Sequence, residues 1–208
     1  SEKLESVGFE RGIGCGVVFY HPVRDISLAV HGDDFTFCAM EGDLHWMREL
    51  MESWFEIKVR GILGGDRGDD KEIVILGRRV EWKESGIEYQ ADPKHRESIM
   101  DHFGLGEESR PLKSNGEKER EDEEGESEEL GKEEAKVYRG LAATLNFLSL
   151  DCPDLQFASK AAARGMSAPR VGSWKVLKKL ARYLVGREAV VWKFEWQDQP
   201  EHSHTWGD

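Results

Sequence analysis

An acidic run at residues 113–134 divides this 208-residue chain into two parts with different patterns. Within it, residues 117–134 contain eleven acidic and three basic side chains, a net charge of −8, and few apolar ones. Such a segment buries too little apolar surface to offset the entropy that a chain loses when it becomes ordered. We therefore predict a flexible linker over 113–134, with folded segments on both sides of it.

Basic side chains gather after the acidic run, in residues 156–193. This stretch holds nine Lys or Arg residues and a single acid, Glu188, which gives a net charge of +8. The chain as a whole carries −12, and that total alone argues against a nucleic-acid partner. Because the two signs are segregated along the chain, their distribution is more informative than their sum. It favours nucleic-acid binding by the part that follows the run.

Cysteine spacing and hydropathy indicate an intracellular protein. The three cysteines are far apart and form neither a zinc-site spacing nor a disulfide framework. The chain has no apolar run long enough to span a membrane and no signal-peptide pattern, so we expect no membrane partner. His202 and His204 form an isolated His-x-His pair, which is too weak a pattern to predict a metal site.

The part before the acidic run is predicted to be a sheet with helices. β-branched and aromatic residues predict strands at 15–20, 26–31, 35–38, 55–59, 73–82 and 87–90. Apolar residues at helical spacing predict a helix over 42–54. A second helix is expected to start at Asp92 and Pro93, a favourable N-cap and first helical residue, and to end near Gly104.

The part after the run is predicted to be mainly helical. Apolar residues recur at three- to four-residue intervals from Val137 to Leu148, and "CPD" at 152–154 starts another helix. A third helix, about 171–185, has one apolar face and one basic face. The basic face comprises Lys175, Lys178, Lys179 and Arg182. Residues 189–196 alternate as a strand does, so the chain as a whole is predicted to have an α+β fold.

The tripeptide Gly-Asp-Asp occurs twice, and its two surroundings differ. Asp69 and Asp70 are flanked by glycine and charged residues, which is typical of a solvated loop. Asp33 and Asp34 lie between two predicted strands, at the tip of a hairpin. A rigid hairpin that presents two carboxylates suits Mg²⁺ or Mn²⁺, and the ion would relieve the repulsion between them. A polar turn without a metal explains this stretch equally well.

In the order of its motifs, the chain resembles the reverse transcriptase of copia-type retrotransposons over about residues 13–208. The match comprises the hairpin "LAVHGDDFTF", the strand "FEIK", the strand "ILGRRVEW" and, after the acidic run, "YRGLAATLNFLSLDCPD", "MSAP" and "RYLVG". The resemblance implies a partial reverse-transcriptase palm over 1–112. It further implies a helical thumb or connection over 135–187, and a strand over 188–208 that leads into a truncated ribonuclease H domain.

The function that the resemblance implies is RNA-directed DNA polymerisation by a two-metal mechanism. Asp33 and Asp34 would hold Mg²⁺ or Mn²⁺. The implied partners are an RNA template, a DNA primer, deoxynucleoside triphosphates and the rest of the Pol polyprotein, in a cytoplasmic particle or the nucleus. The implied nucleic-acid contacts are His31, Gly32, Lys58, Leu76, Gly77, Lys175, Lys178, Lys179 and Arg182. Asp208 stands where the family has the first ribonuclease H carboxylate, and an exposed terminus explains it equally well.

Some residues depart from the family pattern, and other functions stay open. His31 stands where the family usually has Tyr, and Gly32 where it has an apolar residue. Lys58 has a second reading as a solvated edge charge. The family's first catalytic aspartate and its fingers precede the matched region, so we expect these residues alone to be inactive. The alternatives are an RNA-templated RNA polymerase and a decayed or domesticated element fragment that binds nucleic acid or protein without catalysis.

Overall fold

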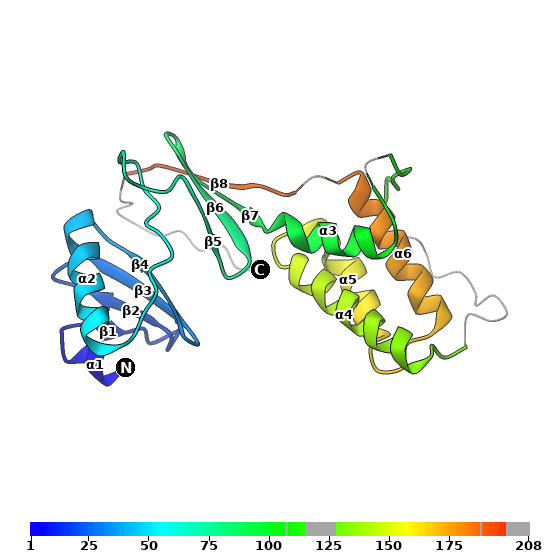
Figure 1. Cartoon of the computed structure of the whole chain (residues 1–208), viewed down its shortest axis with the longest axis horizontal. Helices are drawn as coiled ribbons and strands as arrows, with labels where there is room; N and C mark the ends of the chain where they lie inside the picture. The colour runs from blue at the N-terminus through cyan, green and yellow to red at the C-terminus, as the bar shows by residue number, and fades with distance from the viewer. Residues whose placement is uncertain (107, 115–127, 188, 199–208) are drawn as a thin grey trace, which may run out of the picture. The chain divides into compact units, whose positions relative to one another are not determined.

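The computed structural model describes residues 1–106, 108–114, 128–187 and 189–198 (Figure 1). The chain divides into two structural units, Ser1–Arg60 and Gly61–Asp208. The acidic run was expected to separate the folded parts, and the division instead falls before it. The reason is that Ile99 and Met100, which precede the run, are buried in one core with Leu145 and Leu177, which follow it.

The first unit is a four-stranded antiparallel sheet with two helices. The strands lie in the order β1 (Glu10–Arg11), β2 (Val18–His21), β3 (Ile26–His31) and β4 (Asp34–Cys38), and the helices are α1 (Glu2–Glu5) and α2 (Glu41–Trp54). One face of the sheet packs on α2, because Phe19, Ile26 and Leu28 are buried in one cluster with Met47 and Met51. The predicted strands at 26–31 and 35–38 and the predicted helix are confirmed.

The strand predicted at 55–59 is not formed. Residues after α2 have no strand partner, although Phe55 has an extended backbone. Their apolar side chains instead pack against the first unit. The Phe55 ring stacks on Phe35 at a centroid distance of 6.2 Å, and Ile57 packs against the core of the first unit. Apolar alternation in this segment therefore reflects packing of an extended loop, which a sequence pattern does not separate from strand pairing.

The second unit contains another four-stranded antiparallel sheet. Its order is β5 (Glu72–Ile75), β6 (Arg78–Lys83), β7 (Gly86–Ala91) and β8 (Trp192–Glu195). The strand predicted over 73–82 is in fact a hairpin, because the chain reverses at Leu76 and Gly77. Strand β8 comes from the end of the chain and lies beside β7, with Trp192 opposite Tyr89 (Figure 1).

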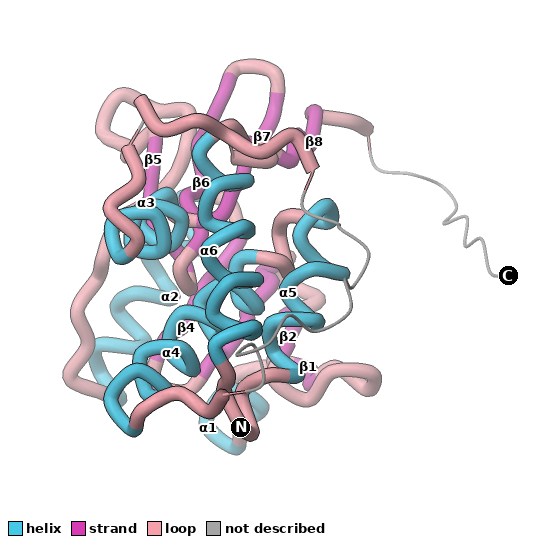
Figure 2. The backbone as a smooth tube through the Cα atoms, turned by 90° about the vertical axis from the view of Figure 1, so that its right-hand side faces the viewer, coloured by secondary structure: helices cyan, strands magenta, loops and turns pink. Residues whose placement is uncertain are grey.

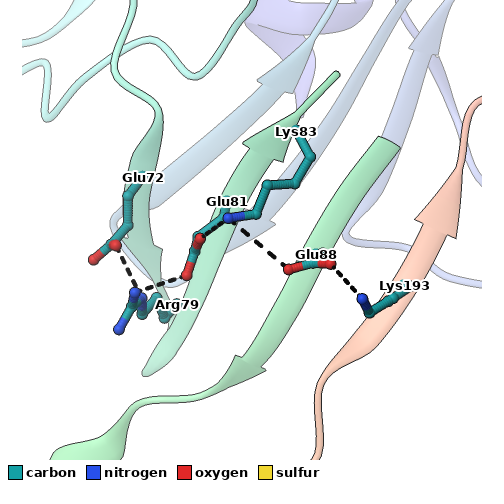
Figure 3. A network of polar contacts seen from close by, with 6 residues as sticks. All are labelled: Glu72, Arg79, Glu81, Lys83, Glu88 and Lys193. Carbon is teal, nitrogen blue, oxygen red and sulfur yellow. Dashed lines mark hydrogen bonds and ion pairs between the residues drawn. The ribbon is translucent and has the colours of Figure 1, made fainter. Parts of the chain in front are cut away.

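One face of this second sheet carries a network of charges, drawn in Figure 3. Its members come from all four strands and are Glu72, Arg79, Glu81, Lys83, Glu88 and Lys193. Arg79 lies 2.9 Å from Glu72 and 2.7 Å from Glu81, measured between nitrogen and oxygen atoms. A hydrogen bond from Lys83 lowers the pKa of Glu81 below its usual value. Opposite charges therefore alternate across this face.

The rest of the second unit is a bundle of helices (Figures 1 and 2). They are α3 (Pro93–His102), α4 (Lys132–Leu148), the short 3₁₀ helix η1 (Pro153–Leu155), α5 (Gln156–Arg164) and α6 (Val171–Val185). The predicted cap of α3 is confirmed, since Asp92 accepts a hydrogen bond from the Lys94 amide at 3.1 Å. Leucines from α4 and α6, with Tyr138, form the centre of the core. No helix in the described ranges is long and apolar enough to cross a membrane.

The end of the acidic run is ordered. Helix α4 begins at Lys132, inside the predicted linker, and Glu129 forms an isolated β-bridge with Arg170. The reason is that acids favour the first turn of a helix, where Glu133 and Glu134 lie, and the Glu134 side chain accepts a hydrogen bond from the Gly131 amide. The central part of the predicted linker, 115–127, lies outside the described residues.

Candidate metal and nucleic-acid site

The first Gly-Asp-Asp lies at the tip of the β3–β4 hairpin, as predicted. His31 and Asp34 form the last cross-strand pair, so Gly32 and Asp33 are the two loop residues. Gly32 has a φ of 63°, whereas Asp33 is not among the residues with positive φ. This combination is that of a type II′ turn, which requires glycine at its first central position. The turn leaves the Asp33 side chain exposed.

Asp34 lies on the sheet face that is turned away from α2. Cross-strand partners share a face, so His31 and Asp34 lie on the opposite side from Val30 and Phe35, which pack against the core. The Asp34 carboxylate accepts a hydrogen bond from Arg60 at 3.0 Å, and the two side chains are 42% and 72% exposed. Because an exposed ion pair is weak, Arg60 leaves Asp34 available to a stronger ligand.

The donor set at this tip fits a divalent ion held partly by water or phosphate. Carboxylate oxygens are the ligands that Mg²⁺ prefers, and Mg²⁺ is usually bound through one or two carboxylates. Asp33 and Asp34 supply that number. Within the part of the chain that the structure describes, no group of three or more His, Cys, Asp or Glu side chains is arranged to hold a metal. Further ligands would therefore come from solvent, substrate or another segment.

The second Gly-Asp-Asp is used to close its own loop. Asp69 accepts a hydrogen bond from the Asp66 amide at 3.0 Å, and the Asp70 amide donates to the Ile62 carbonyl at 2.8 Å. Asp70 also forms a bridge with Leu63. These contacts stabilise the loop, so its backbone geometry accounts for both aspartates. The loop predicted at this position is confirmed.

Leu76 and Gly77 form the turn between β5 and β6. Their φ angles are 49° and 74°, and Ile75 is paired with Arg78 on either side of them. Two consecutive positive φ values are those of a type I′ turn. The Leu76 side chain is 40% exposed, so an apolar group projects from the tip of this hairpin. The two residues implied as primer contacts therefore lie at an accessible turn.

Gly77→Ala should destabilise the second unit by about 1–2 kcal/mol, because φ at this position is left-handed. A Cβ atom would also lie 3.2 Å from His95 and from Phe147. Urea unfolding followed by circular dichroism measures the change. Gly68→Ala is the control, since its Cβ position has no atom within 4 Å, and it should change stability by less than about 0.5 kcal/mol. Similar losses for both variants would contradict this account of the turn.

The basic face predicted on the third helix is formed by α6. Lys175, Lys178 and Lys179 are exposed, while Leu177 and Leu180 are buried on the other side. Arg182 was grouped with these lysines, but it differs from them. It is half-buried, and its guanidinium donates to the backbone carbonyl of Arg110 at 3.4 Å. Three lysines therefore form the accessible basic surface of α6.

The structure gives mixed support to the remaining predicted site residues, and it adds a residue that was not predicted. His31 and Lys58 are exposed, but Lys58 lies in the loop after α2 and not on a strand. Asp208 lies outside the described residues. One residue that the sequence analysis missed is Arg60, the partner of Asp34. No local pattern reveals it, because the two residues meet only through tertiary folding.

Comparisons with known proteins identify no relative. No family model matches the chain, and no curated protein or solved structure is detectably similar to it.

Proposed function

We propose that this chain is part of an RNA-directed DNA polymerase of the copia type, acting inside the cell on an RNA template and a DNA primer. The observation that carries the proposal is the β3–β4 hairpin, with Asp33 exposed in a type II′ turn and Asp34 beside it on the outer sheet face. Asp33 and Asp34 hold the catalytic Mg²⁺ or Mn²⁺ ions, and Asp33 is the stronger ligand because Asp34 also binds Arg60.

The chemistry assigned to this site is nucleotidyl transfer to the primer end. Asp33 and Asp34 would hold the divalent ions, which would supply activation of the primer hydroxyl and stabilisation of the charge that develops on the phosphates. The protein's part is to hold two carboxylates in fixed positions on a paired hairpin, so that little reorganisation is needed when the substrate arrives. In the proposed polymerase, His31, which is paired with Asp34 in the sheet, would help to seat the primer end in place of the family's usual Tyr.

The surface around the hairpin supports this proposal. On β3 and β4, the outer face that carries His31 and Asp34 otherwise bears the short side chains Ser27, Ala29, Thr36 and Cys38. Val18 and Tyr20 of β2 lie on the same face. Short side chains let the backbone of a nucleic acid approach the sheet closely. In the described ranges, the outer edge of β4 makes no backbone hydrogen bond to another segment. A further strand carrying a third carboxylate, as the family has, can pair there.

The second unit contributes two surfaces for the primer–template hybrid. The Leu76–Gly77 turn offers an apolar tip, because Leu76 is 40% exposed. The exposed lysines of α6 offer positive charge to the phosphates. Both surfaces belong to one unit, in which Ala91 at the end of β7 is buried in the core of the helices.

Hybrid binding tests this proposal on the 208-residue chain. The chain should bind an RNA–DNA hybrid with an affinity that falls steeply as salt is raised. Replacing Lys175, Lys178 and Lys179 together by Gln should reduce the slope of log K against log salt by about 2–3, roughly one for each lost phosphate contact. Fluorescence anisotropy over a range of salt concentrations measures both quantities.

The matched control removes the same charge elsewhere. Lys132, Lys136 and Lys160 are also exposed, on α4 and α5, and their replacement by Gln should leave the slope nearly unchanged. If both triple variants lost the same amount, binding would follow net charge and not the α6 surface. Failure of the unmodified chain to bind hybrid at low salt would refute this role of the second unit.

The second candidate function is a non-catalytic module that binds nucleic acid. It is favoured by the Arg60–Asp34 ion pair, which already gives one of the two carboxylates a cationic partner without a metal. Such a module would keep the salt-dependent binding by α6 and would lack metal-dependent synthesis. Primer extension separates the two candidates, because only the polymerase requires Asp33.

A further inference from the structure

Asp151 is a buried carboxylate that connects three strands to the helical bundle. Asp151 follows the end of α4 and is 2% exposed. The sequence analysis did not identify it as a candidate residue. Its Oδ1 atom accepts hydrogen bonds from Arg78 Nε on β6 at 3.0 Å and from the Tyr89 hydroxyl on β7 at 3.1 Å. Its backbone carbonyl accepts one from Trp192 Nε1 on β8 at 2.9 Å. One residue therefore contacts β6, β7 and β8.

A buried carboxylate in such a place is costly, which calls for an explanation. Its other oxygen, Oδ2, is buried without a hydrogen-bond partner in the described part of the chain. Buried ion pairs are poor sources of stability compared with well-packed apolar groups, but they fix the geometry of the groups that they join. Burial and the hydrogen bond to Asp151 raise the pKa of Tyr89. The arrangement therefore favours a role in positioning.

The group that Asp151 positions is the Leu76–Gly77 turn. Arg78 is the next residue after this turn, and its guanidinium also lies over the Phe147 ring of α4, 5.3 Å from the ring centroid. Phe147 and His95 pack against Gly77 so closely that a Cβ atom there would be 3.2 Å from each. Two residues just before and after the end of α4, Phe147 and Asp151, thus hold the turn from two directions.

We propose that Asp151 is a positioning residue, which fixes the Leu76–Gly77 turn on the helical bundle so that the turn and the α6 lysines bind one hybrid together. This rests on the proposed function, because it takes both surfaces as contacts for the primer–template hybrid. The bundle core links the two, since Leu145 and Leu148 of α4 are buried in the same cluster as Leu177 and Leu180 of α6. The turn then keeps a constant position relative to α6.

Asp151→Asn tests the proposal in the whole 208-residue chain, because Asn keeps the volume and removes the charge that holds Arg78. Hydrogen exchange of a peptide spanning residues 74–80, followed by mass spectrometry, should become at least about tenfold faster. The β6–β7 turn, residues 84–86, should exchange as before. Hybrid affinity should fall about tenfold, because a turn that is no longer preorganised must be ordered during binding.

Asp154→Asn is the matched control, three residues further on. Asp154 accepts a hydrogen bond from Tyr183 at 2.7 Å and forms an ion pair with Arg187 at 2.9 Å, so its replacement perturbs the helical region and not the turn. It should leave exchange of residues 74–80 unchanged and hybrid affinity within about twofold of the unmodified chain. If Asp151→Asn does not fold, Tyr89→Phe removes one of the same hydrogen bonds and should raise exchange of residues 74–80 by about threefold.

The outcomes separate this proposal from the function on which it rests. Equal changes in the two Asn variants, or unchanged exchange of residues 74–80 in Asp151→Asn, would overturn the positioning role. Faster exchange without weaker hybrid binding would also overturn it, because the turn and α6 would then act independently. If the unmodified chain bound no hybrid, the proposed function would fail. The claim that the positioned turn helps to bind hybrid would then fail too. The exchange data would still decide whether Asp151 holds the turn.

Discussion

Asp33→Asn should reduce metal-dependent primer extension by at least about 100-fold, because it would remove a proposed ligand of ions that would supply several kcal/mol of charge stabilisation. Asp69→Asn should leave extension within about twofold, since the Asp69 side chain accepts a hydrogen bond from the Asp66 amide in its own loop. The assay is primer extension on an RNA template with Mg²⁺ or Mn²⁺. It uses a polypeptide that joins these residues to the fingers and first palm strand of a copia-type enzyme.

The 208 residues by themselves serve as the further comparison in this assay. Asp33 and Asp34 alone would leave the metal pair with too few protein ligands, so we expect no extension by this chain. Robust extension by it would contradict the need for a third carboxylate. Equal losses from Asp33→Asn and Asp69→Asn would mean that the two Gly-Asp-Asp sequences are not distinguished by function.

Leu145→Ala should destabilise the second unit by about 2–5 kcal/mol, the range for removing a buried leucine side chain and leaving a cavity. Leu145 is 0% exposed at the centre of the core formed by α4 and α6. The free energy of unfolding in urea, followed by the helical signal in circular dichroism, measures this loss.

The control for the core variant is Leu150→Ala, five positions further along the chain. Leu150 is 61% exposed, so its truncation should change the free energy of unfolding by less than about 0.5 kcal/mol. A small effect at Leu145, or an equally large one at Leu150, would show that α4 does not pack as described.

Elements with a strong local signal could be predicted from the sequence. The hairpin at Asp33 was predictable because glycine and aspartate interrupt two β-branched and aromatic runs, and a type II′ turn uses glycine in that place. Helices α2 and α6 were predictable because apolar residues recur at helical spacing. The Leu76–Gly77 turn was missed because leucine rarely adopts positive φ, so residues 73–82 read as one strand.

The features that could not be predicted depend on contacts between residues that are distant in the sequence. Asp34 meets Arg60, and Arg78 meets Asp151, only after the chain has folded, and neither partner has a local signature. The acidic run was interpreted by composition alone, and its last residues instead begin α4, where acids favour a helix N-terminus. Composition predicts whether a segment can fold alone, but not whether a neighbouring segment orders it.

The pairing of β8 with β7 has a consequence for the order of folding. Strands β5, β6 and β7 are consecutive hairpins that can form soon after synthesis, whereas Trp192 reaches Tyr89 only across the whole helical bundle. Closing a loop of roughly 100 residues is entropically costly and slow, so β8 should join the sheet last. Until then the edge of β7 and the ring of Tyr89 are left uncovered on the nascent chain. This interval is when the protein is most exposed to aggregation and most in need of a chaperone.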